Sequence, residues 1–200
     1  MPPATARGIN ETMTVESDRD LAGLRKAGRV IALGLAEMKA NLQPGMTTAE
    51  LDGYIADAAV TVSLPPSPTA HERLRDGALA AFGRAVAVAR VGRPLNKIGR
   101  AVETTTRRQG FTVFPDLSGH GVGRTIHEYP TIPNYYDRRL KMPLREGLVI
   151  TIEPIISSGS NRTIGAEDGW TIKTADGSPA THYEHTIVIT RGSPMLLTAA

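Results

Sequence analysis

Residues 118–130 of this 200-residue chain read SGHGVGRTIHEYP, and they hold two of its five histidines, His120 and His127. Three glycines lie around the first of these histidines. Glycine has no side chain and tolerates positive φ, so the backbone can turn tightly here or approach a ligand closely while the imidazoles point into a site. We therefore interpret residues 118–130 as a loop that carries a functional site.

Two carboxylates downstream of this loop are further candidates. Glu153 lies in the apolar run LVITIEPII of residues 148–156, and Glu184 lies in YEHTIVIT of residues 183–190. A charge inside an apolar strand costs on the order of several kcal/mol unless it is paired or bound to a metal. That cost favours a functional role for Glu153. For Glu184 alone the simpler interpretation is the solvent face of an alternating strand, and for each histidine alone it is a hydrogen-bonded structural role.

The chain contains no cysteine, so it has neither a disulfide framework nor a thiolate ligand. Any metal must therefore be held by nitrogen and oxygen atoms. One imidazole from His120 and two carboxylates from Glu153 and Glu184 form a ligand set that suits Co, Mn, Fe or Zn.

Amphipathic helices are expected before the loop and strands after it. Apolar residues at three- and four-residue spacings predict helices over residues 17–42, 47–58, 70–90 and 95–109. The β-like segments are residues 60–64, 111–114, 148–156, 170–174 and 183–190. This order predicts an α+β fold in which an antiparallel sheet packs one face on helix pairs. The helix-pair pattern recurs at an offset of 47 residues, which indicates either an internal duplication or the general likeness of amphipathic helix pairs.

Composition is consistent with one domain and with a cytoplasmic protein. Residues 1–15 are polar and aperiodic, and we expect them to be a flexible leader before a single domain over residues 16–200. No stretch has the length of a signal peptide core or a membrane span. Residues 71–110 carry nine Arg and Lys against three acidic residues, whereas the whole chain has a net charge of +3. This basic helical segment is either a solvated face or a surface for a ribosome, RNA or an acidic protein.

Four stretches in this order resemble the C-terminal motifs of type I methionine aminopeptidases, which are pita-bread metallopeptidases. They are residues 118–130, LREGLVITIEP of residues 144–154, DGWTIKT of residues 168–174, and YEHTIVIT of residues 183–190. The resemblance covers residues 70–195 well, and residues 18–59 look like the first helix pair of that family. It implies a pita-bread fold with a pseudo-twofold duplication, which would account for the helix-pair repeat.

The resemblance also implies roles for particular residues. His120, Glu153 and Glu184 resemble three of the five metal ligands of the family, and Glu153 also resembles the carboxylate that activates water. His127 resembles the histidine that binds the substrate carbonyl and the oxyanion. Ile126 and Trp170 lie where the family lines the pocket for the methionine side chain.

One part of the family pattern is missing between the predicted helix pairs. Val60 to Val62 resemble the residues immediately after the first ligand aspartate of the family, with Ala59 in the place of that aspartate, and the strand with the second aspartate is lacking. Asp57 is nearby, but its context matches neither ligand. We therefore expect a deletion near residues 59–68, an incomplete N-terminal half, an exposed sheet edge that the leader or a partner covers, and one metal ion rather than two.

The leading hypothesis is a metal-dependent aminopeptidase that removes methionine from the N-terminus of nascent proteins or peptides. Glu153 would accept the proton of the attacking water, and His127 would stabilise the oxyanion. The alternative is an impaired or inactive paralogue that binds a ribosome, RNA or protein through the basic helical segment. Neither a membrane nor DNA is expected as a partner. A third possibility is that the chain is a deleted version of a longer gene product.

Overall fold

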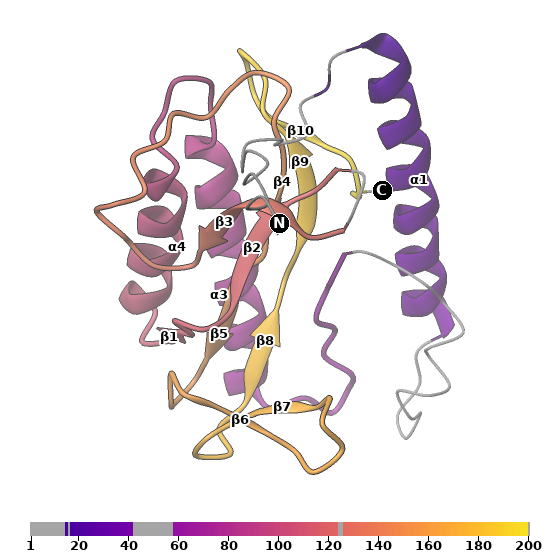
Figure 1. Cartoon of the computed structure of the whole chain (residues 1–200). Helices are drawn as coiled ribbons and strands as arrows, with labels where there is room; N and C mark the ends of the chain where they lie inside the picture. The colour runs from indigo at the N-terminus through magenta and orange to yellow at the C-terminus, as the bar shows by residue number, and fades with distance from the viewer. Residues whose placement is uncertain (1–14, 16, 42–57, 124–125, 200) are drawn as a thin grey trace, which may run out of the picture.

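The computed structural model describes residue 15 and residues 17–41, 58–123 and 126–199, and within them it contains helices and antiparallel sheets (Figure 1). The predicted α+β class is confirmed. The leader, apart from Val15, lies outside the described residues, as do Asp57 and the helix predicted over residues 47–58, apart from Ala58. The repeat of helix pairs therefore stays a prediction.

Three helices are described, and each follows the periodicity of its sequence. Helix α1 (Asp18–Asn41) begins after Ser17, whose hydroxyl accepts the N–H of Asp20 at 3.2 Å and donates to its carboxylate at 2.7 Å. Helix α3 (Thr69–Val88) comes after the Pro-rich segment, and helix α4 (Asn96–Arg108) ends before Gly110, which has φ +82°. Among the described residues, no helix combines the length and apolarity needed to cross a membrane.

The larger sheet has five antiparallel strands in the order β10-β9-β4-β2-β3. Its strands are β2 (Ser118–Gly121), β3 (Glu128–Pro133), β4 (Val149–Ile152), β9 (His185–Val188) and β10 (Met195–Leu196). Strands β4 and β9 lie at its centre and all of their residues are buried. This sheet carries the histidine-containing strand β2 directly beside β4.

The smaller sheet continues the two central strands. It has the order β1-β5-β8, formed by β1 (Thr112–Val113), β5 (Ile155–Ser157) and β8 (Ala180–His182). Only two residues separate β4 from β5, and two separate β8 from β9. The strands predicted over residues 148–156 and 183–190 are thus each interrupted where the chain passes from one sheet to the other. Strands β6 (Thr163–Gly165) and β7 (Ile172–Thr174) form a separate hairpin.

Two predictions of local structure are wrong. Residues 118–130 are not a loop throughout, because they contain all of β2 and the start of β3. A Cβ on Gly121 would overlap the carbonyl of Tyr129, so glycine is needed there for strand approach, and none of the glycines of residues 118–123 has positive φ. Residues 60–64 form no strand. Only Ala59 makes a β-bridge, to Glu184, and the segment is joined to β8 through the Thr61 side chain.

Helices α3 and α4 pack together on the sheets and enclose the main core, which confirms a helix pair on one face (Figure 1). The core includes Leu74, Phe82, Ile98, Ile132, Ile150, Ile152, Ile156 and Ile187. Helix α1 lies instead beside the β9–β10 edge (Figure 1). It meets the chain just after β10 at Gly28, where an added Cβ would overlap the backbone of Leu197.

Candidate metal site

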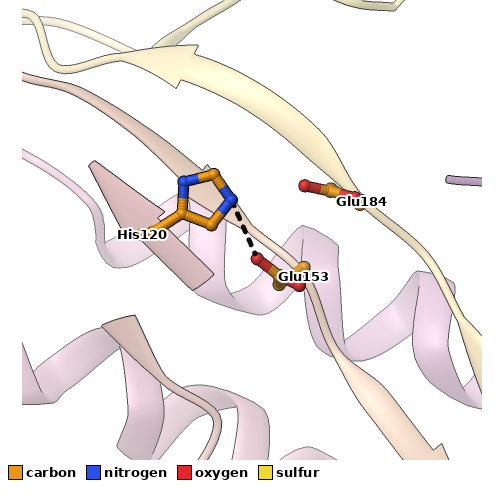
Figure 2. A group of neighbouring side chains, drawn as sticks. All are labelled: His120, Glu153 and Glu184. Carbon is orange, nitrogen blue, oxygen red and sulfur yellow. Dashed lines mark ion pairs between the residues drawn. The ribbon is translucent and has the colours of Figure 1, made fainter. Parts of the chain in front are cut away.

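The three predicted metal ligands come together where the two sheets join. His120 comes from β2, Glu153 from the break between β4 and β5, and Glu184 from the break between β8 and β9 (Figure 2). One ligand atom of each lies within 4.8 Å of those of the other two. The register explains the meeting of the carboxylates, because Ile152 pairs with His185 and Ile155 pairs with His182 on either side of them.

His120 is held in the tautomer that leaves Nε2 able to bind a metal. Its Nδ1 lies 2.9 Å from the carbonyl oxygen of Gly121, and because a carbonyl can only accept, Nδ1 must carry the hydrogen. The lone pair is therefore on Nε2, which faces Oε1 of Glu153 at 3.7 Å (Figure 2). A hydrogen bond to the far nitrogen is the usual means of orienting a metal-binding histidine.

Thr151 holds both His120 and Glu153, although its residue type and position in the sequence suggested no role. Its hydroxyl accepts the backbone N–H of His120 at 3.0 Å and donates to Oε1 of Glu153 at 2.9 Å. The side chain is fully buried. Asn134, also buried, donates to the backbone carbonyl of Glu153 at 2.9 Å. These bonds fix the break between β4 and β5, so the Glu153 carboxylate has little freedom to turn away.

The two carboxylates are largely removed from water. The Glu153 side chain is 11% exposed and Glu184 is 8% exposed. The interpretation that Glu184 lies on the solvent face of a strand is therefore wrong. Glu184 lies in the break between β8 and β9, at the junction of the two sheets. Two buried anions that face a common space repel each other, and a bound cation removes that cost. The donors present thus fit a divalent metal in both type and charge.

His182 also faces this space, and the sequence did not predict it as a site residue. Its Nε2 lies 3.5 Å from Oε2 of Glu184 and 3.7 Å from Oε2 of Glu153. Burial lowers the pKa of His182 to about 4, so the imidazole is neutral near pH 7. The available signal was the spacing of two residues between His182 and Glu184, because side chains two apart on a strand share a face.

The predicted substrate residues are more exposed. The ring centroid of His127 lies 4.2 Å from that of His120, and the residue is exposed, so a substrate could reach it. Ile126 is 51% exposed and Trp170 is 91% exposed. Neither side chain therefore lines a buried pocket in this structure. Trp170 lies in a turn that Asp168 closes by accepting its backbone N–H at 3.0 Å.

Comparison with known proteins assigns the fold and the site to a family. Residues 48–191 match the family model described as metallopeptidase family M24. The chain belongs to this family. The matched span contains every strand from β1 to β9 and all three predicted ligands. The family is one of metallopeptidases, so the chain is a hydrolase of a family that uses a divalent metal. The predicted pita-bread fold is confirmed.

Methionine aminopeptidases are among the relatives of this M24 chain. It is 33% identical to "Methionine aminopeptidase 2" of Bacillus subtilis over 247 residues, which cover 93% of this chain and 99% of that protein. It is 40% identical to "Methionine aminopeptidase" of Aquifex aeolicus over 149 residues, covering 74% of this chain and 58% of that protein. The first alignment is longer than this chain, so the M24 chain is shortened relative to that protein.

Solved structures agree with this assignment. The methionine aminopeptidase of Thermotoga maritima has a TM-score of 0.88 at 26% identity, covering 94% of this chain and 100% of that one. Prolidase from Pyrococcus horikoshii, at 18% identity and a TM-score of 0.72, covers 92% of this chain and 63% of that one and shares the fold. The predicted resemblance to methionine aminopeptidases is confirmed, and the non-enzymatic alternative is not favoured.

Proposed function

We propose that this M24 chain is a metal-dependent aminopeptidase that removes the N-terminal methionine from nascent proteins or peptides in the cytoplasm. The observation that carries the proposal is the convergence of His120, Glu153 and Glu184, with ligand atoms within 4.8 Å of one another. The similarity to two curated methionine aminopeptidases supports the choice of substrate. Its domain is residues 16–200, shortened near residues 59–68.

The donor set favours a single ion, with Co, Mn, Fe or Zn as the candidates. A divalent metal in such a site lowers the pKa of water and polarises a carbonyl group. Ala59 supports the count of one ion. It forms the β-bridge to Glu184, and its methyl group offers no ligand on that side of the carboxylate.

Glu153 is suited to accept the proton of the attacking water. Its side chain is 11% exposed, Thr151 donates to Oε1 at 2.9 Å, and Oε2 lies 3.7 Å from Nε2 of His182. A general base needs a fixed position within reach of the proton that it takes. His127, exposed beside the His120 ring, is suited to donate a hydrogen bond to the substrate carbonyl as charge develops on its oxygen.

Ile126 and Trp170 would flank the methionine side chain of the substrate. Both side chains are exposed, at 51% and 91%, so both are accessible to a peptide. An apolar side chain covered in this way gains about 25 cal/mol for each Å² of apolar surface buried. The peptide N-terminus is thus the partner that these side chains fit.

The test is release of methionine from a Met-Ala peptide in the presence of Co, Mn, Fe or Zn, with Glu153→Gln as the variant. Loss of the basic oxygen should lower kcat by at least about a hundredfold, since general acid–base catalysis contributes about 100- to 10,000-fold. The control is Glu167→Gln, which changes an exposed carboxylate of the β6–β7 region and should leave kcat unchanged. No turnover by the wild type with any of the four metals would contradict the proposal.

A groove between α3 and α4 supports ribosome contact as a second role. It has a volume of about 520 Å³ and is lined by Arg84, Arg93, Lys97, Arg100 and Arg108 among others. Clustered cations along a groove attract phosphate backbones, and such binding weakens as salt rises. We expect Arg84→Glu with Arg93→Glu to reduce co-sedimentation with ribosomes at low salt without changing peptidase activity. Co-sedimentation that is equal for both proteins at all salt concentrations would contradict this role.

A further inference from the structure

His182 and His185 flank Glu184 on either side, and their surroundings differ. Both ring nitrogens of His185 have partners: Nδ1 lies 3.0 Å from the Thr198 hydroxyl and Nε2 lies 3.2 Å from the Tyr183 hydroxyl. The Nε2 atom of His182 is buried and has no hydrogen-bond partner in the described part of the chain. A buried polar atom without a partner costs about 1–3 kcal/mol. His185 is thus a satisfied core histidine, whereas His182 Nε2 lacks a partner.

Two carboxylates surround that nitrogen. It lies 3.5 Å from Oε2 of Glu184 and 3.7 Å from Oε2 of Glu153, distances too long for N–H···O hydrogen bonds. Glu153 faces an imidazole with each of its oxygens, because Oε1 lies 3.7 Å from Nε2 of His120. Glu153 thus faces His120 with one oxygen and His182 with the other, and His182 also faces Glu184.

The separations of His182 Nε2 from the two carboxylate oxygens are close to those of atoms that share one metal ion. Two ligands at 2.1 Å from a tetrahedral ion lie about 3.4 Å apart, and adjacent ligands of an octahedral ion lie about 3.0 Å apart. The observed 3.5 and 3.7 Å need a shift of only a few tenths of an ångström. A hydrogen-bonded imidazole–carboxylate pair would lie closer than this, at about 2.7–2.9 Å.

The backbone of His182 is held in place by the segment that precedes the Pro-rich turn. The Thr61 hydroxyl donates to the His182 carbonyl at 2.9 Å and lies 3.2 Å from the His182 N–H, which donates to it. Two residues earlier, the Ala59 carbonyl accepts the N–H of Glu184 at 2.7 Å. Thr61 and Ala59 thus set the position of both His182 and Glu184, while Ala59 itself carries no ligating group.

We propose that His182 is a fourth ligand of the metal, so that two histidines and two glutamates hold a single divalent ion. The proposal rests on the metal site of the proposed function and adds to it a ligand from β8. Two imidazoles shift the preference of the site toward Zn, Co or Fe and away from Mn, which favours oxygen ligands. The two carboxylates balance the charge of one divalent ion.

X-ray absorption at the zinc edge tests the proposal on the wild-type protein loaded with one equivalent of Zn. We expect the spectrum to require two imidazole ligands. A spectrum that requires only one imidazole would overturn the proposal. This measurement needs no variant, so the proposal remains testable even if a variant fails to fold.

The matched variants are His182→Gln and His71→Gln. His71 is exposed on α3 and its substitution should leave zinc affinity and the spectrum unchanged. His182→Gln should reduce the fitted imidazoles from two to one and weaken zinc affinity in isothermal titration by at least about a hundredfold, since loss of an outer-shell partner alone costs about 10- to 100-fold. Unchanged affinity and an unchanged spectrum in folded His182→Gln would contradict a ligand role.

The outcomes separate this inference from the proposed function. Methionine release by a zinc-loaded protein with one imidazole would overturn the role of His182 and leave the aminopeptidase standing. Two imidazoles in a protein without peptidase activity would support His182 and contradict the aminopeptidase. Failure of the wild type to bind any divalent ion would contradict both.

Discussion

Helix α1 and the helix pair α3–α4 all have apolar residues at three- and four-residue spacings, but they bury different amounts of that apolar surface in the core. Helix α3 buries Leu74, Ala78 and Phe82 on the sheets, and its neighbour α4 buries Ile98. In α1, Gly28 and Ala32 are buried, whereas Val30 and Leu33 are 63% and 59% exposed. The strands β4 and β9 beside the metal site pack on the α3–α4 core with one face, and with the other they form a smaller apolar cluster that Leu24 of α1 contacts. The difference teaches that the two faces of the same strands are covered unequally, with the larger core on the α3–α4 side.

The largest expected effect comes from removing bulk from that core beneath the site. Ile150 of β4 is fully buried, and Ile150→Ala should lower the free energy of unfolding by about 2–5 kcal/mol because it leaves a cavity. The matched control is Ile164→Ala on β6, which is 49% exposed and should change stability by less than about 0.5 kcal/mol. Urea denaturation followed by circular dichroism measures both. Equal losses would show that the division between core and periphery is wrong.

A smaller effect is expected from Thr151, which connects the core to the site. Thr151→Val keeps the shape but removes the hydroxyl that His120 and Glu153 share. We expect metal affinity to fall about 10- to 100-fold, as for other partners of metal ligands. Stability should fall by about 1–3 kcal/mol, because a buried N–H and a carboxylate lose a partner. Isothermal titration with Zn and urea denaturation give the two values, and unchanged affinity would remove Thr151 from the site.

A loss of stability of similar size, but with no effect on the metal site, is expected where α1 meets the chain just after β10. A Cβ at Gly28 would overlap the Leu197 backbone, so Gly28→Ala should destabilise this contact by about 1–3 kcal/mol. Gly23 of the same helix has open space, and Gly23→Ala should instead stabilise the helix by up to about 1 kcal/mol. Hydrogen exchange of α1 amides measures both changes.

Zinc affinity sharpens the same comparison, because α1 contributes no ligand to the described site. We expect Gly28→Ala to leave zinc affinity within a factor of about two, since distant and independent sites behave additively. A large loss of affinity would show that α1 supports the site as well as its own contact.

Much of the helical structure could be predicted from periodicity alone. The predicted helices at residues 17–42, 70–90 and 95–109 correspond to α1, α3 and α4, because apolar spacing of three and four residues is a local property. Strands were less predictable. Residues 118–121 are rich in glycine and lack strand propensity, yet they pair with β3 and β4 because only glycine permits the close approach.

The site was partly predictable for a similar reason. An isolated carboxylate in an apolar run marked Glu153, and glycine-flanked histidines marked His120. Thr151 carries no such local signal, since a threonine in a strand is ordinary, and His182 is marked only by its two-residue spacing from Glu184. Their relevance depends on which strand lies opposite, and this is decided by the register of β5 with β8 and of β4 with β9.

The sequence by itself determined the helices, the absence of thiolate ligands, the motif order that indicates the metallopeptidase family, and three candidate ligands. Tertiary structure alone decided that Glu184 is buried, that Thr151 joins His120 to Glu153, and that His182 faces both carboxylates. The physical reason is the difference in the range over which these effects act along the chain. Periodicity and residue chemistry act along a few neighbouring residues, whereas a metal site depends on distances of a few ångströms between segments that are far apart in the chain.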